Sequence, residues 1–246
     1  MTATLVLGPS LGTSAATLWG PCADLMRDQL DVVAWDLPGH GADPGPAPPD
    51  LTVAQLAARV LDLVEGPFHY AGDSVGGAVG LQLALDAPDR LQSLVVLCSG
   101  ARLGTPESWQ ERIDLVGRGG TSVMVGPSAR RWFGPGFVER EPDRAGALLH
   151  ALADTTDEGY LAVCHALSVY DVRDRLAEIA GPVLAIAGAE DAVTPPTSLQ
   201  EVADHVPDGR LVVLDGVGHL APVERPHDVA RLVLEHCARH PSRRTA

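Results

Sequence analysis

The chain has 246 residues, 46% of them hydrophobic, and a formal net charge of −14 at pH 7. This length and apolar content are typical of one α/β domain with a large core. The acidic balance argues against nucleic acid as a partner. No apolar run approaches the roughly 20 residues that cross a bilayer, so we expect no membrane partner. All 18 basic residues are Arg, so an anionic ligand would need an Arg to bind it.

The start of the chain lacks a basic leader and reads directly as a strand, so we expect no secretory signal and a cytoplasmic protein. The four cysteines lie far apart without paired spacing, which indicates core thiols rather than a disulfide framework or a metal site. They are Cys22, Cys98, Cys164 and Cys237. The chain has no Walker-type loop, no dinucleotide fingerprint and no metal-ligand spacing of histidines, so we predict no cofactor and no metal.

Strand-like and helix-like segments alternate over the first 100 residues. Short apolar runs predict strands over 4–8, 31–36, 68–71 and 94–98. Helical patterns between them extend from near Pro21 to Leu30, from Thr52 to about Glu65, and over 78–87. Pro21 favours a first helical turn, and Thr52 forms a capping box with Gln55. Strands separated by helices predict a mostly parallel, doubly wound sheet.

From residue 106 to about 180 the alternation stops and only helical patterns follow. They cover 107–116, 122–131, 144–153, 158–169 and 173–179. Strands over 182–188 and 211–214 then resume the sheet, and a last helix covers 227–238. Helices inserted between strands predict a cap over the carboxyl ends of the strands, where open α/β sheets keep their sites. We therefore predict a core domain of residues 1–104 and 181–246, and a helical cap of residues 105–180.

Gly72-Asp73-Ser74-Val75-Gly76 lies between a predicted strand and a predicted helix. This is the context in which Gly-x-Ser-x-Gly forms a nucleophile elbow. The serine would sit on a sharp, strained turn, so the residues two before and two after it must lack bulk. Alternatively, the glycines only let a helix pack tightly on a strand. Asp73 should point away from the serine, into solvent or an ion pair.

A serine nucleophile needs a base, and the base needs an acid to orient it. Asp191 follows the strand that ends at Gly188, and His219 follows the next strand. Alone, Asp191 could be a helix cap or turn residue, and His219 a loop histidine without a task. Because they occur in hydrolase order at corresponding strand ends, we predict a Ser74-His219-Asp191 triad. Glu190 is the reserve acid, and Asp215 is less favoured because it precedes the loop.

Two backbone amides are expected to form an oxyanion hole. The residue after the nucleophile, Val75, supplies one, and Leu11 in the loop after the first strand supplies the other. His40, in the run from Asp36 to Gly41, is predicted to serve the structure of a turn.

Along nearly its whole length the chain resembles the α/β-hydrolase superfamily, and within it the 3-oxoadipate enol-lactonases. Besides the elbow, the matching segments are 10–14, 97–109, 112–114, 131–133, 159–160 and 190–196. The resemblance implies the α/β-hydrolase fold, here without the usual antiparallel hairpin before the first strand. Two further departures are Pro9, where relatives often have Asn, and Asp73, which is unusual before the serine.

The resemblance also implies a function, the opening of a small enol-lactone that bears a carboxylate, to give 3-oxoadipate in aromatic-acid breakdown. Arg131 is then the expected clamp for the carboxylate, with Trp132 as a pocket wall. Arg130 or Arg112 could replace Arg131, or Arg131 could be solvated while Trp132 only fills the cap. A general carboxylesterase or other acyl hydrolase, and a non-catalytic small-molecule sensor, are the alternatives. The sequence indicates no oligomeric state.

Overall fold

The computed structural model describes residues 2–241, and its centre is a six-stranded parallel sheet of order β2-β1-β3-β4-β5-β6. The strands are β1 (Thr4–Gly8), β2 (Asp31–Ala34), β3 (Phe68–Asp73), β4 (Leu91–Leu97), β5 (Val183–Gly188) and β6 (Gly209–Leu214). The order reverses between β1 and β3, which are neighbours in the sheet although β2 lies between them in the chain. Open α/β sheets bind ligands at such a switch point, outside the carboxyl ends of the strands.

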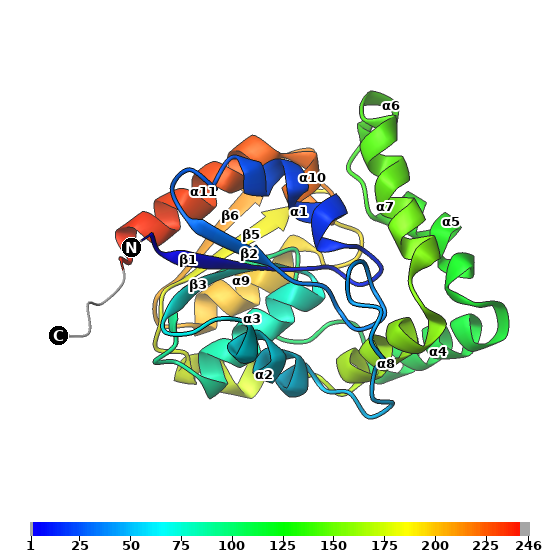
Figure 1. Ribbon diagram of the computed structural model, residues 1–246, viewed down its shortest axis with the longest axis horizontal. Helices are drawn as coiled ribbons and strands as arrows, with labels where there is room; N and C mark the ends of the chain where they lie inside the picture. The colour runs from blue at the N-terminus through cyan, green and yellow to red at the C-terminus, as the bar shows by residue number, and fades with distance from the viewer. Residues whose placement is uncertain (1, 242–246) are drawn as a thin grey trace.

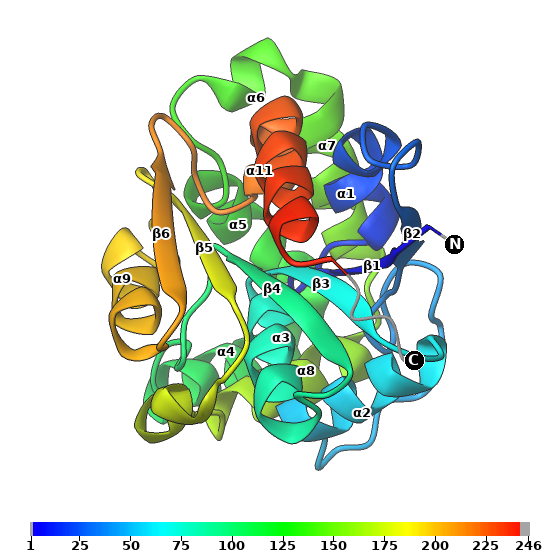
Figure 2. The ribbon, with the colours of Figure 1, turned by 90° about the vertical axis from the view of Figure 1, so that its left-hand side faces the viewer.

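Helices cover both faces of this sheet. They are α1 (Ala15–Asp24), α2 (Val53–Leu63), α3 (Val75–Asp86), α9 (Pro196–His205), α10 (Ala221–Glu224) and α11 (Pro226–Arg239). Helices α1, α10 and α11 pack together on one face, and α2, α3 and α9 lie on the other (Figures 1 and 2). The predicted doubly wound parallel sheet is confirmed.

Between β4 and β5, the regular secondary structure of the chain is helical. Its elements are α4 (Pro106–Gly119), η1 (Thr121–Met124), α5 (Val125–Arg131), α6 (Phe137–Arg140), α7 (Pro142–Asp154), α8 (Asp157–Ser168) and η2 (Arg173–Glu178). Helices α4 to α8 lie beyond the carboxyl ends of the strands, at the right of Figure 1. We call residues 106–178 the helical insertion. The predicted division into core and cap domains at 104/105 and 180/181 stays a prediction.

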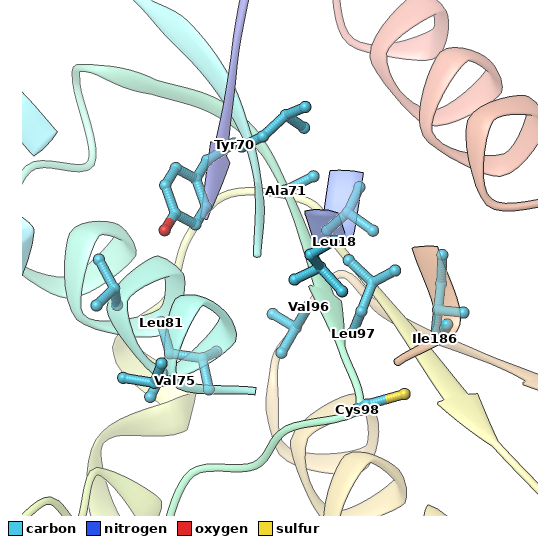
Figure 3. Packing of buried hydrophobic residues seen from close by; sticks show 14 of the residues in the cluster. Leu18, Tyr70, Ala71, Val75, Leu81, Val96, Leu97, Cys98 and Ile186 are labelled. Atoms are coloured by element: carbon cyan, nitrogen blue, oxygen red, sulfur yellow. The ribbon is translucent and has the colours of Figure 1, made fainter. Parts of the chain in front are cut away.

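The core lies between the sheet and its two helix layers. Strand β3 is buried at all its positions, as expected for a central parallel strand that is covered on both faces. Leu18 from α1 and Leu81 from α3 belong to the same buried cluster as the strand residues Tyr70 and Val96 (Figure 3). Among residues 2–241, no helix combines the length and the apolar character needed to cross a membrane.

The predicted start of the first helix near Pro21 is wrong, because α1 begins earlier in the chain. Ser14 forms the cap, because its hydroxyl accepts the N–H of Thr17 while the Thr17 side chain accepts the N–H of Ser14. This capping box begins the helix at Ala15, and Pro21 lies inside it. The predicted capping box of Thr52 on α2 is confirmed.

Short elements account for most of the other differences. The predicted helix over 122–131 is divided into η1 and α5, and the predicted helix over 173–179 is the 3₁₀ helix η2. Helices α6 and α10 were not predicted, because elements of four residues are too short to show a helical period. Helix α9 was also missed, although Pro196 at its first turn is a typical start signal.

Candidate active site

Ser74 occupies the sharp turn between β3 and α3. Its φ of 53° and ψ of −115° lie outside the regions that ordinary residues adopt, and such strain costs about 1–3 kcal/mol. A Cβ atom on Gly72 would overlap the carbonyl oxygen of Gly76, and one on Gly76 would lie 2.6 Å from the carbonyl group of Gly8. The steric requirement that the sequence predicted for this turn is confirmed.

Hydrogen bonds from β4 and the loop after it hold the strained turn. The N–H of Ser74 donates to the carbonyl of Leu97 at 2.9 Å. The hydroxyl of Ser99 donates to the carbonyl of Ser74 at 2.6 Å. Because both polar backbone groups of Ser74 are satisfied, the conformation that raises its hydroxyl above the sheet is stabilised.

The structure brings Ser74, His219 and Asp191 together from the ends of three strands. The Ser74 hydroxyl lies 3.0 Å from Nε2 of His219, and Nδ1 of His219 lies 2.8 Å from Oδ2 of Asp191. The three residues are buried, with exposed fractions of 7%, 2% and 5%. These are the contacts that proton transfer from a serine to a histidine oriented by a carboxylate requires.

Asp191 is surrounded by hydrogen-bond donors. Besides His219, its carboxylate accepts the N–H groups of Val193 at 2.7 Å and Thr194 at 2.9 Å, and the Thr194 hydroxyl at 2.8 Å. Burial opposes the charged form, but the neighbouring His219 and these hydrogen bonds hold the pKa of Asp191 below its ordinary value. A charged Asp191 keeps the proton of the imidazole on Nδ1, so that Nε2 is free to accept the proton of Ser74. The other acids considered, Glu190 and Asp215, are exposed.

The two residues predicted to supply the oxyanion hole lie near Ser74. Leu11 lies in the loop after β1 and lines the same cavity as Ser74, and Val75 is the first residue of α3. Thr13 holds the loop through its hydroxyl, which donates to the carbonyl of Ser10 at 2.9 Å. A helix N-terminus and a fixed loop amide at this place can stabilise a developing oxyanion. The role of these two amides stays a prediction.

A cavity of about 150 Å³ opens over Ser74, between the sheet and the helical insertion. Its lining residues come from the loops after β1, β3, β4, β5 and β6 and from the helical insertion. They are Ser10, Leu11, Ser74, Leu103, Gly104, Ser108, Trp109, Arg112, Met124, Pro127, Ser128, Arg131, Trp132, Tyr160, Leu167, Val193, Thr194 and His219. The reactive side chains therefore face a small space with a mixed polar and apolar wall.

Two arginines face this cavity, and the structure gives neither an acidic partner. The guanidinium of Arg112 lies 4.8 Å from the ring centroid of Trp109 and beside the hydroxyl of Tyr160. Arg131 donates to the carbonyl of Ala192 at 3.4 Å. Within residues 2–241, no carboxylate lies within ion-pair distance of either guanidinium. Partial burial and the positive charge of Arg112 hold the pKa of Arg131 below its ordinary value. Two unpaired cations on one cavity wall suit an anionic ligand.

The other residues predicted for substrate binding divide between the cavity and the surface. Trp132 is buried and lines the cavity. Arg130 and Arg131 are both exposed, but Arg130, unlike Arg131, is not part of the lining. The sequence reasoning gave no role to Trp109, which carries Arg112 on its ring, or to Tyr160. The i, i+3 spacing of Trp109 and Arg112 on one helix was the available signal.

The prediction for Asp73 is wrong, because this residue reaches neither solvent nor an ion pair. It is completely buried as the last residue of β3. Among the described residues, no hydrogen-bond partner is found for either of its carboxylate oxygens. Burial, followed by the negative charges of Asp191 and Glu224, raises the pKa of Asp73 well above its ordinary value. Burial without a hydrogen-bond partner therefore favours the neutral, protonated form of Asp73.

His40 has the structural role in a turn that the sequence predicted. It is buried, and its Nδ1 donates to the carbonyl of Pro38 at 2.9 Å. Its ring stacks on that of Tyr160, with 6.5 Å between centroids and an interplanar angle of 16°. The N–H of Thr156 also donates to the carbonyl of Gly39 at 2.9 Å. This turn therefore ties helix α8 of the insertion to the sheet.

No group of three or more His, Cys, Asp or Glu side chains in residues 2–241 is arranged to hold a metal ion. The four cysteines of the chain are buried in the core.

Known proteins resemble this chain over most of its length. A family model described as "Alpha/beta hydrolase family" matches residues 5–232. The 3-oxoadipate enol-lactonase 2 of Acinetobacter baylyi is 35% identical over 226 residues, which cover 90% of this chain and 84% of the relative. A protein of Pseudomonas savastanoi pv. phaseolicola, whose name assigns it provisionally as a carbamate hydrolase, RutD, is 31% identical over 94% of this chain and 92% of its own.

Solved structures give the same result. The enol-lactonase from Burkholderia xenovorans LB400 superposes with a TM-score of 0.90 at 29% identity, over 96% of this chain and 91% of that chain. The resemblance that was stated from the sequence is confirmed.

Proposed function

We propose that this chain, which belongs to the alpha/beta hydrolase family and has its fold, is a cytoplasmic serine hydrolase. Its reaction would open 3-oxoadipate enol-lactone to 3-oxoadipate, a step in the breakdown of aromatic acids. The observation that carries the proposal is the pairing of two features in one cavity. The Ser74-His219-Asp191 contacts supply a nucleophile with its base and acid. Arg112 and Arg131, which lack acidic partners in the described part of the chain, supply a place for the carboxylate of the substrate.

The first half of the reaction would form an acyl-enzyme. Ser74 Oγ attacks the lactone carbonyl while Nε2 of His219 takes the hydroxyl proton, and Asp191 stabilises the imidazolium. The amides of Leu11 and Val75 stabilise the negative charge on the carbonyl oxygen. The ring C–O bond then breaks, and the enolate oxygen that leaves receives the proton from His219. The resulting enol converts to the ketone.

The second half would release the product. His219 takes a proton from a water molecule as the water oxygen adds to the ester carbonyl. The bond between Ser74 Oγ and the acyl carbon breaks, and Oγ takes the proton back from His219. Because the leaving group of the first step stays attached to the acyl chain, the pocket must hold both ends of the opened molecule. A small cavity with cations in its wall meets this need.

A second candidate is the hydrolysis of another ester or of a carbamate at the same residues. It is favoured by the provisional carbamate hydrolase among the relatives, at 31% identity. A non-catalytic sensor of small molecules is the remaining alternative. The aligned hydrogen bonds from Ser74 through His219 to Asp191 argue against a sensor.

Turnover by purified wild type and by Ser74→Ala, on the enol-lactone and on a neutral ester of similar size, distinguishes these functions. We expect wild type to prefer the lactone and Ser74→Ala to lose kcat by at least about 10⁴-fold. Hydrolysis of the ester without opening of the lactone would favour a general esterase. Binding of the lactone without turnover, unchanged in Ser74→Ala, would favour a sensor.

A further inference from the structure

Glu224, the last residue of the short helix α10, connects two distant parts of the chain. Its Oε1 accepts the N–H of Gly218 at 2.9 Å, and its Oε2 accepts the N–H of Gly134 at 2.8 Å. Gly218 directly precedes His219, and Gly134 follows Arg131 and the two aromatic residues after it. One carboxylate therefore contacts both the loop of the proposed base and the helical insertion.

The two connected segments also pack directly against each other, backbone on backbone. We call residues 132–134 the insertion segment and residues 216–219 the histidine loop. The N–H of His219 donates to the carbonyl of Trp132 at 2.7 Å. A Cβ atom on Gly218 would lie 2.6 Å from both the carbonyl oxygen of Trp132 and the amide nitrogen of Gly134. A Cβ atom on Gly134 would overlap the carbonyl oxygen of Gly216. The approach leaves no room for a side chain at either glycine.

The ionised form of Glu224 suits this position, because each of its oxygens accepts an N–H group. Burial raises the pKa of Glu224 to about 7, although the N–H groups of Gly134, Gly218 and Leu220 oppose the shift. Removing the carboxylate would leave two N–H groups without acceptors between packed segments. Because leaving a buried N–H group without an acceptor is costly, we expect one segment to move relative to the other.

We propose that Glu224 is a positioning residue that fixes the histidine loop and the insertion segment to each other. One carboxylate then sets two properties of the site: the alignment of His219 with Ser74, and the place of Arg131 and Trp132 in the cavity wall. The proposal rests on the proposed function in that His219 and Arg131 serve the hydrolysis. A change at Glu224 must therefore affect proton transfer and recognition of the anionic substrate together.

The test compares Glu224→Ala, Glu224→Gln and Gly134→Ala with wild type at pH 8, on the enol-lactone and on a neutral ester. Stoichiometric labelling of Ser74 by a fluorophosphonate counts the folded sites, so kcat is expressed per reactive serine. Asp228→Ala is the matched control, because Asp228 is an acid near Glu224 in the chain that pairs with Arg225 and Arg231 at the surface.

For Glu224→Ala we expect kcat per labelled serine to fall by about 10- to 100-fold on both substrates, since small misplacements of catalytic groups have effects of this size. KM should rise for the lactone and stay near the wild-type value for the ester. Glu224→Gln, which keeps one acceptor, should be intermediate. Gly134→Ala should reproduce these changes in kcat and KM with the acid intact. The double variant Glu224→Ala/Gly134→Ala should have a kcat no lower than that of the more impaired single variant.

Two results would overturn the proposal. One is a normal kcat per labelled serine with fewer labelled sites, which means that Glu224 serves stability alone. The other is a fall in kcat with an unchanged KM for the lactone, which means that the insertion segment does not depend on Glu224. If wild type opens no lactone, the proposed function fails on that measurement by itself. The rate constant for labelling of Ser74 then decides the case of Glu224: a slower rate in Glu224→Ala supports it, and an unchanged rate overturns it.

Discussion

Asp191 and Asp73 are both buried aspartates, near the carboxyl ends of β5 and β3, yet their surroundings shift their pKa values in opposite directions. Asp191 accepts hydrogen bonds from Val193, Thr194 and His219, and stays ionised. For Asp73 the described residues offer no hydrogen-bond donor, and burial raises its pKa, which favours the protonated form. Burial is common to both, so the donors decide the charge. Arg112 and Arg131 are a third case, because no described residue gives them an acidic partner and both face a cavity where a ligand can supply one.

The largest effect is expected for Asp191→Asn. The substitution removes the negative charge and favours the wrong imidazole tautomer, so kcat on any accepted ester should fall by about 10⁴-fold. Steady-state kinetics of the purified variant measure this. Glu190→Gln is the matched control, because Glu190 is the exposed neighbour of Asp191. A comparable loss in Glu190→Gln would mean that the structure misidentifies the acid.

Arg131→Ala tests whether the guanidinium in the cavity lining binds the carboxylate of the substrate. Losing a charged hydrogen bond of about 1.5–3 kcal/mol should raise KM for the lactone by about 10- to 100-fold, and KM for a neutral ester should change little. Arg130→Ala, at the exposed neighbour, should behave as wild type. Equal effects of Arg131→Ala on the KM of both substrates would contradict the prediction that Arg131 binds the carboxylate of the substrate.

Asp73→Asn should separate the two aspartates most clearly. Because burial favours the neutral form of Asp73, a neutral amide should replace it with kcat near the wild-type value. The folded state keeps a proton that the unfolded state releases above about pH 4, so wild type loses stability as the pH rises from there. At pH 8 the variant should be more stable by about 1–3 kcal/mol, since it avoids this cost. Urea denaturation at pH 4 and pH 8 measures the difference, and the same pH dependence in both proteins would show that Asp73 is not a neutral acid.

His69 is the basic counterpart of Asp73 and should give the smallest effect. Burial, followed by the charge of His240, lowers the pKa of His69 to about 4, and its Nδ1 lies 2.8 Å from the hydroxyl of Ser93. As the pH falls from about 6.5 to 4, the unfolded state binds a proton that the folded state does not, so stability falls by about 1–2 kcal/mol. His69→Gln should lose less stability than wild type between pH 7.5 and pH 5 in urea denaturation. An equal loss would assign the acid sensitivity to other groups, such as His236.

The sequence was sufficient to predict the parallel sheet and the contact of three side chains that lie far apart in the chain. Ser74, Asp191 and His219 each follow a strand, and parallel strands bring their carboxyl ends to one edge. Chain order and local pattern therefore fixed their meeting place. The start of α1 was missed because a capping box at Ser14 outweighs the preference of Pro21 for a first turn.

What could not be predicted depends on packing between distant segments. The raised pKa of Asp73 could not be predicted because it depends on the burial of every position of β3. The presence of Arg112 from helix α4 and Arg131 from helix α5 in the lining of one cavity depends on how these helices pack. The contacts of Glu224 with Gly134 and Gly218 join three segments that no local pattern relates.

The helical insertion is fastened to the rest of the chain at several separate places. The turn at Gly39 bonds to Thr156, the N–H of Val172 donates to the carbonyl of Ala101, and residues 132–134 pack on the loop before His219. Because these attachments are spread along the insertion, it is not free to swing away from the sheet as one body. We therefore expect the cavity to stay small when a ligand enters. Such a site would admit compact acids and turn away long-chain esters before they meet the serine.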